Sequence, residues 1–205
     1  MENQSLIITP VTLEGRYARL EPLSMNHLVP LCQVGFDPEL WRVALSVIKE
    51  EEDMRAYIAT ALQWQMEGTA LPFVTIERSS GTVVGSTRFA NIERIHRRLE
   101  IGWTWVARAW QRTPINTEAK YLMLTHAFET LGCIRVELKT DSLNEKSRKA
   151  MLRIGAKEEG TLRNHMITQG GRIRHSVYYS ITNDEWPGVK RLLEEKLTRP
   201  FEQLV

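Results

Sequence analysis

The spacing of hydrophobic residues in the first third of the chain predicts two short strands followed by two helices. Short β-favouring runs flank the turn at Glu14-Gly15. Apolar residues then recur every three or four positions in two stretches, which is typical of amphipathic helices. Ser24 is a suitable N-cap for the first helix, and Gly68 ends the second. The predicted elements are strands at 6–12 and 17–21 and helices at 24–34 and 53–67.

The middle of the chain changes from β-favouring runs to a helical pattern and back again. A turn at Ser79-Ser80-Gly81 predicts that the first two of three strands form a hairpin. A helix between two strands indicates a β-α-β unit, whose strands run parallel and whose crossover is right-handed. The predicted elements are strands at 71–77, 82–90 and 99–106, a helix at 115–131 and a strand at 134–140.

The last third adds a helix, two strands and a final helix. Gly155 ends the first of these helices, and Asp184 is expected to cap the last. The predicted elements are a helix at 144–154, strands at 157–162 and 174–181, and a helix at about 184–198. Together these elements predict an α/β fold, α+β in character, with a central mixed sheet flanked by helices. Because no linker or repeat divides the chain, we expect a single domain over 1–205 with its core at about 15–186.

Composition and charge narrow the classes of partner. The 205 residues carry a formal net charge of +2, with acids and bases interspersed, so no nucleic-acid partner is expected. No apolar run approaches the ~20 residues of a membrane span, and the N-terminus lacks the features of a signal peptide. We therefore expect a cytoplasmic protein with no membrane partner. The 2 cysteines and 5 histidines have no metal-ligand spacing, so no metal is expected.

The segment from Trp110 to Lys120 joins the strand at 99–106 to the helix at 115–131. The first N–H groups of a helix have no partner within it and lie at the positive end of its dipole. A strand, a turn of small and polar residues and a helix start together form an anion-binding device. The sequence therefore predicts a phosphate-bearing ligand at this place.

Five motifs follow one another around these elements. They are Leu99-Glu100-Ile101-Gly102-Trp103, Asn116-Thr117-Glu118-Ala119-Lys120, His126-Ala127-Phe128-Glu129, Asn144-Glu145-Lys146-Ser147 and Ile154-Gly155-Ala156-Lys157-Glu158-Glu159-Gly160. With these motifs the chain resembles the GNAT superfamily of acyl-CoA-dependent N-acyltransferases, and most closely the RimJ/RimL type, which acetylates protein N-termini and small amines. The resemblance extends from about Gly15 to Trp186 and implies a central sheet in which two strands splay apart.

The resemblance also implies that acetyl-CoA is the acetyl donor. The family's pyrophosphate loop, Gln/Arg-x-x-Gly-x-Gly/Ala, aligns with 111–116, but Pro114 and Asn116 replace its small residues. Proline lacks an N–H, so one phosphate donor is missing, although proline suits the first turn of a helix. The residues implied to bind CoA are Trp103, Thr104, Trp105 and Val106 through their backbone, Gln111, Arg112, Thr113, Ile115, Asn116 and Thr117 at the phosphates, and Asn144 and Ser147 along the arm.

Glu100 and Ser147 are the candidate catalytic residues. Glu100 is flanked by Leu99 and Ile101, and apolar surroundings would make its carboxylate a better general base. A surface glutamate at a strand edge is the alternative. The resemblance implies that the Ser147 hydroxyl reaches the leaving thiolate and that Asn144, on the same helix face, holds the arm. The type and position of Asn144 also predict an ordinary N-cap, and the two roles are compatible.

The alternation of side chains along the strand at 99–106 predicts which residues share a face. Trp103 and Trp105 should lie on one face, and Glu100 and Thr104 on the other. A backbone N–H near Trp105 could then serve the oxyanion of the reaction.

Two functions remain open from the sequence. The first is an N-acetyltransferase in which the amine attacks acetyl-CoA directly in a ternary complex. A covalent acyl-enzyme would need a suitably placed cysteine, and the sequence does not indicate one. The second is a non-catalytic CoA-binding module, which Pro114 and Asn116 favour. The amine acceptor, a protein N-terminus or a small molecule, is not specified. His165 and His175 either border its site or lie exposed, and the late strands could pair across a homodimer.

Overall fold

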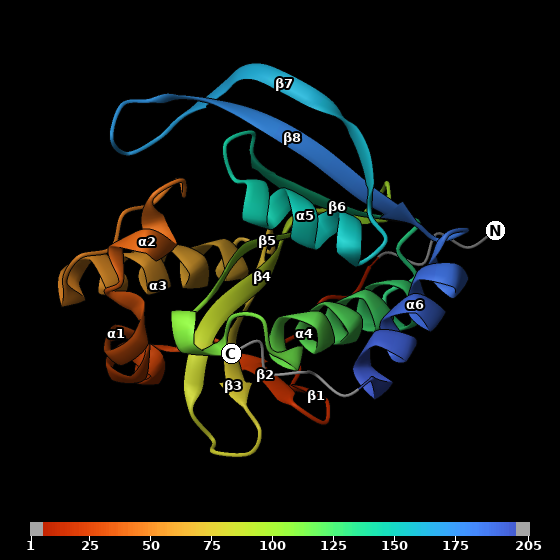
Figure 1. Cartoon of the computed structure of the whole chain (residues 1–205), viewed down its shortest axis with the longest axis horizontal. Coiled ribbons are helices and arrows are strands. Elements are labelled where there is room, and N and C mark those ends of the chain that lie inside the picture. The colour runs from red at the N-terminus through yellow and green to blue at the C-terminus, as the bar shows by residue number, and fades with distance from the viewer. Residues whose placement is uncertain (1–5, 200–205) are drawn as a thin grey trace.

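The computed structural model describes residues 6–199, whose strands form one eight-stranded sheet in the order β1-β2-β3-β4-β5-β6-β8-β7 (Figure 1). Neighbouring strands are antiparallel except β5 and β6, which run parallel as the β-α-β pattern predicts. The mixed α/β fold predicted from the sequence is thus confirmed. The strands are β1 (Leu13–Glu14), β2 (Ala18–Pro22), β3 (Leu71–Glu77), β4 (Val83–Glu93), β5 (Arg98–Val106), β6 (Arg135–Asp141), β7 (Lys157–Ile167) and β8 (Ile173–Thr182).

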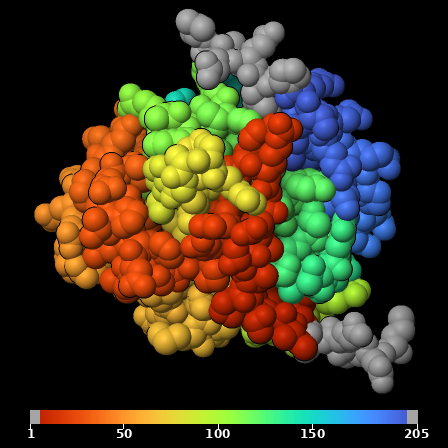
Figure 2. All heavy atoms as spheres, turned by 90° about the horizontal axis from the view of Figure 1, so that it is seen from below, coloured from red at the N-terminus to blue at the C-terminus, as the bar shows by residue number. Residues whose placement is uncertain are grey.

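Helices cover both faces of the sheet (Figure 1). On one face, α1 (Leu28–Gly35), α2 (Pro38–Trp41) and α3 (Glu51–Met66) enclose an aromatic cluster with Trp41, Tyr57 and Trp105. The other face carries α4 (Pro114–Thr125) with its π-helical end η3 (His126–Thr130), α5 (Glu145–Arg153) and α6 (Trp186–Thr198). In Figure 2 the red β1–β2 segment lies between the orange first helices and the green and blue later ones. Within residues 6–199 no helix is long and apolar enough to cross a membrane.

Several predicted boundaries are wrong. Residues 6–12 form no strand, although Leu6 is buried and Val11 packs on the core. The short helix α2 was not predicted, although Asp37 caps it by accepting from the N–H of Glu39 at 3.0 Å. Strand β7 continues five residues beyond its predicted end at Leu162. The last helix begins after Glu185 rather than Asp184.

A buried carboxylate fixes the N-terminal strands to α4. Glu118 is 5% exposed and accepts hydrogen bonds from the N–H groups of Arg16, Tyr17 and Ala18 at 2.8, 2.5 and 2.6 Å. The carboxylate lies where a side chain on Gly15 would be, since a Cβ there would come within 2.3 Å of the Glu118 Cδ. This motif residue therefore holds the start of α4 in place against the sheet.

The β7–β8 hairpin is the most extended feature of the molecule and reaches towards the α2 side (Figure 1). Its turn contacts the segment after α2, where the Gln169 N–H donates to the carbonyl of Leu45 at 3.2 Å. The Gln169 Oε1 accepts from the N–H of Val47 at 2.7 Å. The hairpin is therefore attached at its base, through β8, and at its turn.

Candidate active site

Strands β5 and β6 pair only at their beginnings. Arg98, Leu99 and Glu100 are opposite Arg135, Val136 and Glu137, and no further pair is formed between the described parts of the two strands. Beyond this point β5 stays with β4, while β6 stays with β8 as far as Asp141. Backbone groups on the two facing edges are therefore left without ladder partners, and an extended, amide-bearing ligand can satisfy them.

A β-bulge at Trp103 interrupts β5 beside this divergence. The register between β4 and β5 shifts between Ser86 and Arg88, and Trp103 has a φ of +47°. Trp103 and Trp105 both pack on the α1–α3 side, as predicted. Thr104 points the opposite way, with its Oγ1 2.7 Å from the Nζ of Lys120 on α4.

The prediction that Glu100 shares a face with Thr104 is wrong. Glu100 lies on the side of Trp103, because Lys139 contacts both the Glu100 carboxylate and the Trp103 ring. The extra residue of a bulge reverses the alternation of every side chain that follows.

The surroundings of Glu100 are buried but not apolar. The residue is 2% exposed, and its Oε2 lies 2.9 Å from the ammonium of Lys139 and accepts from the Nδ2 of Asn91 at 2.8 Å. The prediction of an apolar environment is therefore wrong, because the side chain from the neighbouring strand β6 balances the charge. Glu100 lines a cavity of about 620 Å³ together with Thr69, Asn91, Ile92, Glu93, Arg98, Glu137, Leu162 and Tyr178.

The cavity continues as a row of polar side chains across β6, β8 and β7. Lys139 lies 5.8 Å from the ring centroid of Tyr178, whose hydroxyl is 3.5 Å from the Nε2 of His165. Burial lowers the pKa of His165, and the charges of Lys139 and Arg174 lower it further. His165 is half-buried and contacts Tyr178, which lines the cavity, but it does not line the cavity itself. Its place beside the acceptor site stays a prediction.

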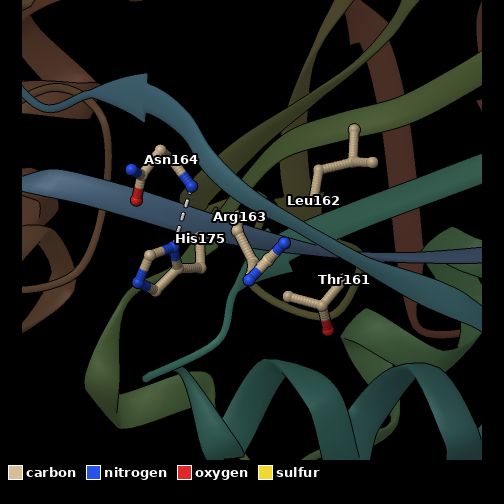
Figure 3. A pocket seen from close by; sticks show the side chains of 5 residues that line it. All are labelled: Thr161, Leu162, Arg163, Asn164 and His175. Carbon is tan, nitrogen blue, oxygen red and sulfur yellow. Dashed lines mark hydrogen bonds between the residues drawn. The ribbon is translucent and has the colours of Figure 1, made fainter.

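The second histidine of the hairpin lies elsewhere. His175 is exposed, and its Nδ1 accepts from the N–H of Asn164 at 2.9 Å (Figure 3). It lines a separate hollow of about 570 Å³ with Thr161, Leu162, Arg163 and Asn164. Only Leu162 lines both this hollow and the cavity of Glu100. His165 and His175 thus lie in different environments, although both flank one turn.

The loop after β5 is closed by its own side chains. The Nε2 of Gln111 donates to the carbonyl of Val106 at 2.9 Å. Thr113 donates to the carbonyl of Trp110 at 2.7 Å and accepts from the N–H of Ile115 at 3.4 Å, so it is the N-cap of α4. Pro114 is the first residue of the helix, as its lack of an N–H favours.

The start of α4 offers fewer side-chain donors to a phosphate than predicted. Ile115 packs in a small core cluster with Ala18, and Thr117 is fully buried with its Oγ1 accepting from Arg153 at 3.1 Å. Only their backbone N–H groups could meet a ligand. Arg112 is exposed with a φ of +62°, and its guanidinium can donate to a phosphate. The Oδ1 of Asn116 is buried without a hydrogen-bond partner, but an amide oxygen only accepts and cannot bind a phosphate oxygen. The guanidinium of Arg112, the backbone N–H groups and the helix dipole fit a diphosphate at this end.

Asn144 and Ser147 occupy the start of α5. The Oδ1 of Asn144 accepts from the N–H of Ser147 at 3.1 Å, which confirms that Asn144 is the N-cap. Both side chains are half-buried. The α5 start follows directly on β6, the strand that diverges from β5, so both residues lie at the edge of the divergence.

Three residues of this region were not singled out from the sequence. Lys139 and Arg88 each occupy a strand position that reads as solvent-exposed, yet both reach the Trp103 ring. Lys120 is 6% exposed on α4, and burial lowers its pKa to about 7. A charged residue inside an apolar run was the available signal, but it does not distinguish a buried group from an exposed one.

Comparison with known proteins agrees with this geometry. The chain is 37% identical over 111 residues to YdaF from Bacillus subtilis (strain 168), an N-acetyltransferase by name. That match covers 54% of this chain and 59% of YdaF, and so spans about three fifths of the relative's length. The crystal structure of a GCN5-related N-acetyltransferase from Brucella melitensis has a TM-score of 0.86 at 28% identity, covering 94% of this chain and 87% of that chain.

A more distant structure shares the fold. Mycobacterium smegmatis RimJ, in complex with CoA-disulfide, has a TM-score of 0.78 at 22% identity, covering 91% of this chain and 95% of that chain. Residues 18–157, more than half of the 205, match the acetyltransferase (GNAT) domain. The diverging strands, the bulge and this match together show that the chain belongs to the GNAT family of N-acetyltransferases.

Proposed function

We propose that the protein transfers the acetyl group of acetyl-CoA to a primary amine by direct attack in a ternary complex. The observation that carries this proposal is the divergence of β5 and β6 immediately after Glu100 and Glu137. It places unpaired backbone edges, the bulge at Trp103 and a buried carboxylate within one short stretch of sheet. An extended thioester arm fits such edges, and its reacting end would lie next to Glu100.

The reaction needs one bond formed and one broken. The amine nitrogen attacks the thioester carbon, the N–C bond forms and the C–S bond breaks. Glu100 takes the proton that the amine loses, and the Ser147 hydroxyl gives one to the departing sulfur, with solvent restoring both residues. Backbone N–H groups near Trp105, turned by the bulge, would hold the oxyanion, and losing one such donor typically costs about 10²–10³ in rate.

The ion pair with Lys139 shapes the role of Glu100. Lys139 and Asn91 fix the carboxylate in one orientation, which favours accurate proton transfer. The cavity on this side also has room for water between the carboxylate and an amine. Glu100 would therefore act on the acceptor side of the sheet, while Asn144 and Ser147 would act on the side of the CoA arm.

The acceptor class follows from the relatives only in outline. YdaF's name refers to ribosomal N-acetylation. The resemblance to the RimJ/RimL type implies a protein N-terminus or a small amine as the acceptor. The cavity beside Glu100 lies between the end of α3, near Thr69, and the β7–β8 hairpin, at Leu162 and Tyr178. We place the amine there.

A thiol-release assay tests the proposal. Purified protein, acetyl-CoA and a broad panel of primary amines are mixed, and free CoA is followed over time. Turnover of at least one amine, lost in Glu100→Gln, supports the proposal. CoA binding without turnover of any amine would support a non-catalytic CoA-binding module, the function that Pro114 and Asn116 favour.

A further inference from the structure

Arg88 is a buried arginine without an anionic partner. It is 1% exposed on β4, and its Nε and Nη2 are buried without a hydrogen-bond partner. Three aromatic rings surround the guanidinium, with the centroids of Tyr57, Trp64 and Trp103 at 4.8, 5.4 and 5.2 Å from its Cζ. None of the ion pairs formed within residues 6–199 includes Arg88.

Aromatic rings alone offset only part of the free-energy cost of burying a guanidinium. Each ring contact offsets part of the desolvation, but a buried charge is normally paired with an opposite charge and its N–H donors are normally satisfied. The buried charge next to it follows that rule, since Glu100 has Lys139. In the described part of the chain, Arg88 has neither an ion pair nor a hydrogen-bond partner for its Nε and Nη2, which indicates a site whose anion comes from a ligand.

Arg88 also faces the same side of the sheet as Glu100. Arg88 is opposite Gly102, and a Cβ on Gly102 would lie 2.7 Å from the Oε1 of Glu100. The two charged residues are thus diagonal neighbours on adjacent strands, and the Cα atoms of such neighbours typically lie about 7–8 Å apart. Trp64 and Trp103 are only half-buried, so two of the three rings that cover Arg88 are partly exposed to solvent.

We propose that the acceptor is a small amino-carboxylate, such as a free amino acid, whose carboxylate binds Arg88 while its amine lies beside Glu100. This inference rests on the proposed function and names its substrate class. A guanidinium presents parallel N–H donors that match a carboxylate. A polycationic acceptor of the aminoglycoside kind would be repelled by Arg88, and a peptide N-terminus has no carboxylate next to its amine.

Matched acceptors test the inference. CoA release is measured with free amino acids, with their carboxamides and with short peptides that begin with the same residues. We expect at least one free amino acid to exceed its carboxamide in kcat/KM by about 100-fold, because a site built for a polar group rejects an analogue that leaves it unpaired. Equal or better turnover of carboxamides or peptides would overturn the inference while leaving the proposed function intact.

Two variants assign the preference to Arg88. Arg88→Met should abolish the preference for the free amino acid over its carboxamide. It should raise KM for the free amino acid and leave KM for the carboxamide nearly unchanged. It should not lower Tm. Arg98→Met removes another cation, which lines the same cavity and pairs with Glu137, and should keep the preference. If Arg88→Met keeps the preference, the assignment is wrong. If it unfolds, the acid-to-amide ratio of the wild type decides.

A binding measurement separates this inference from the proposed function. If no amine releases CoA, tryptophan fluorescence is titrated with N-acetylglycine and with N-acetylglycinamide in the presence of CoA. A response to the carboxylate alone, absent in Arg88→Met, would retain the anion site without the acetyl transfer. No response to the carboxylate would refute the site.

Discussion

The Glu100 carboxylate and the Lys139 ammonium lie 2.9 Å apart across the point where β5 and β6 separate. Both side chains are nearly inaccessible, with 3% and 10% exposed. Lys139→Met would leave a buried carboxylate unpaired and should lower the free energy of unfolding by about 3–5 kcal/mol. The Glu100→Gln/Lys139→Met double variant should recover most of that loss in urea unfolding. A single Lys139→Met variant as stable as the wild type would contradict the pairing.

Glu100→Gln should lower kcat by about 10²–10⁴-fold, with a small effect on KM for acetyl-CoA, because a general base acts on the amine. Steady-state CoA release measures both constants. Glu137→Gln is the control, since Glu137 lines the same cavity and pairs with Arg98 and Arg135. Equal losses in the two variants would point to the charge of the cavity instead of a specific base.

Asn144 has a cap role and a proposed CoA contact, and two substitutions separate them. Asn144→Ala should cost about 1 kcal/mol of stability through the lost cap and should also weaken CoA binding. Asn144→Asp retains an oxygen for the Ser147 N–H and should keep Tm near the wild-type value, while CoA affinity still falls. Calorimetric titration with CoA and thermal melts provide the two readouts. Unchanged CoA affinity in both variants would exclude the contact.

Burial of Lys120 makes stability depend on pH. Its pKa falls from the ordinary 10.5 to about 7 in the folded protein. Between these values only the unfolded chain holds the proton, so the free energy of unfolding should rise with pH by about 1.4 kcal/mol per unit. Below pH 7 both states are protonated, and the folded state then carries the whole desolvation cost.

Lys120→Met should remove that rise and stabilise the protein most at and below pH 7. Urea unfolding at pH 6, 8 and 9.5 checks this. Lys149→Met is the matched control, because the Lys149 side chain is 80% exposed. A slope that persists in Lys120→Met would show that another group is responsible.

Pro114 removes one N–H from the start of α4. Pro114→Ala restores that donor and keeps a residue suited to the first helical turn. If a phosphate binds there, one added charge-assisted hydrogen bond should tighten CoA binding by roughly tenfold. Titration calorimetry measures the change. No gain in affinity would place the phosphates away from the first turn of α4.

The regular helices and strands could be predicted from the sequence better than the irregular segments. Strand β3 has the predicted bounds, because all of its positions but the last are buried and it pairs with β2 and β4, although it contains Pro72. Residues 6–12 have similar apolar content, yet they pack on the core without pairing, and composition does not reveal this difference. The π-helical turn at the end of α4 leaves no signature in the spacing of its residues.

The same limit applies to the candidate site. Asn144 could be placed because capping is a local property. The same local property makes Thr113 the N-cap of α4, although it was predicted only as a phosphate contact. The face occupied by Thr104 could not be predicted, since it depends on a one-residue bulge against β4. Lys139 beside Glu100, and Arg88 among three rings, depend on contacts between strands far apart in the sequence. Local periodicity carries no information about such neighbours.

The two hydrogen bonds of Gln169 to the segment near Leu45 and Val47 hold the far end of the β7–β8 hairpin. Leu162 and Tyr178, the hairpin residues that line the cavity of Glu100, lie in the part of the hairpin where β8 pairs with β6. That side of the cavity is therefore shaped before any acceptor arrives, and a ligand that fits it loses little free energy in ordering the protein.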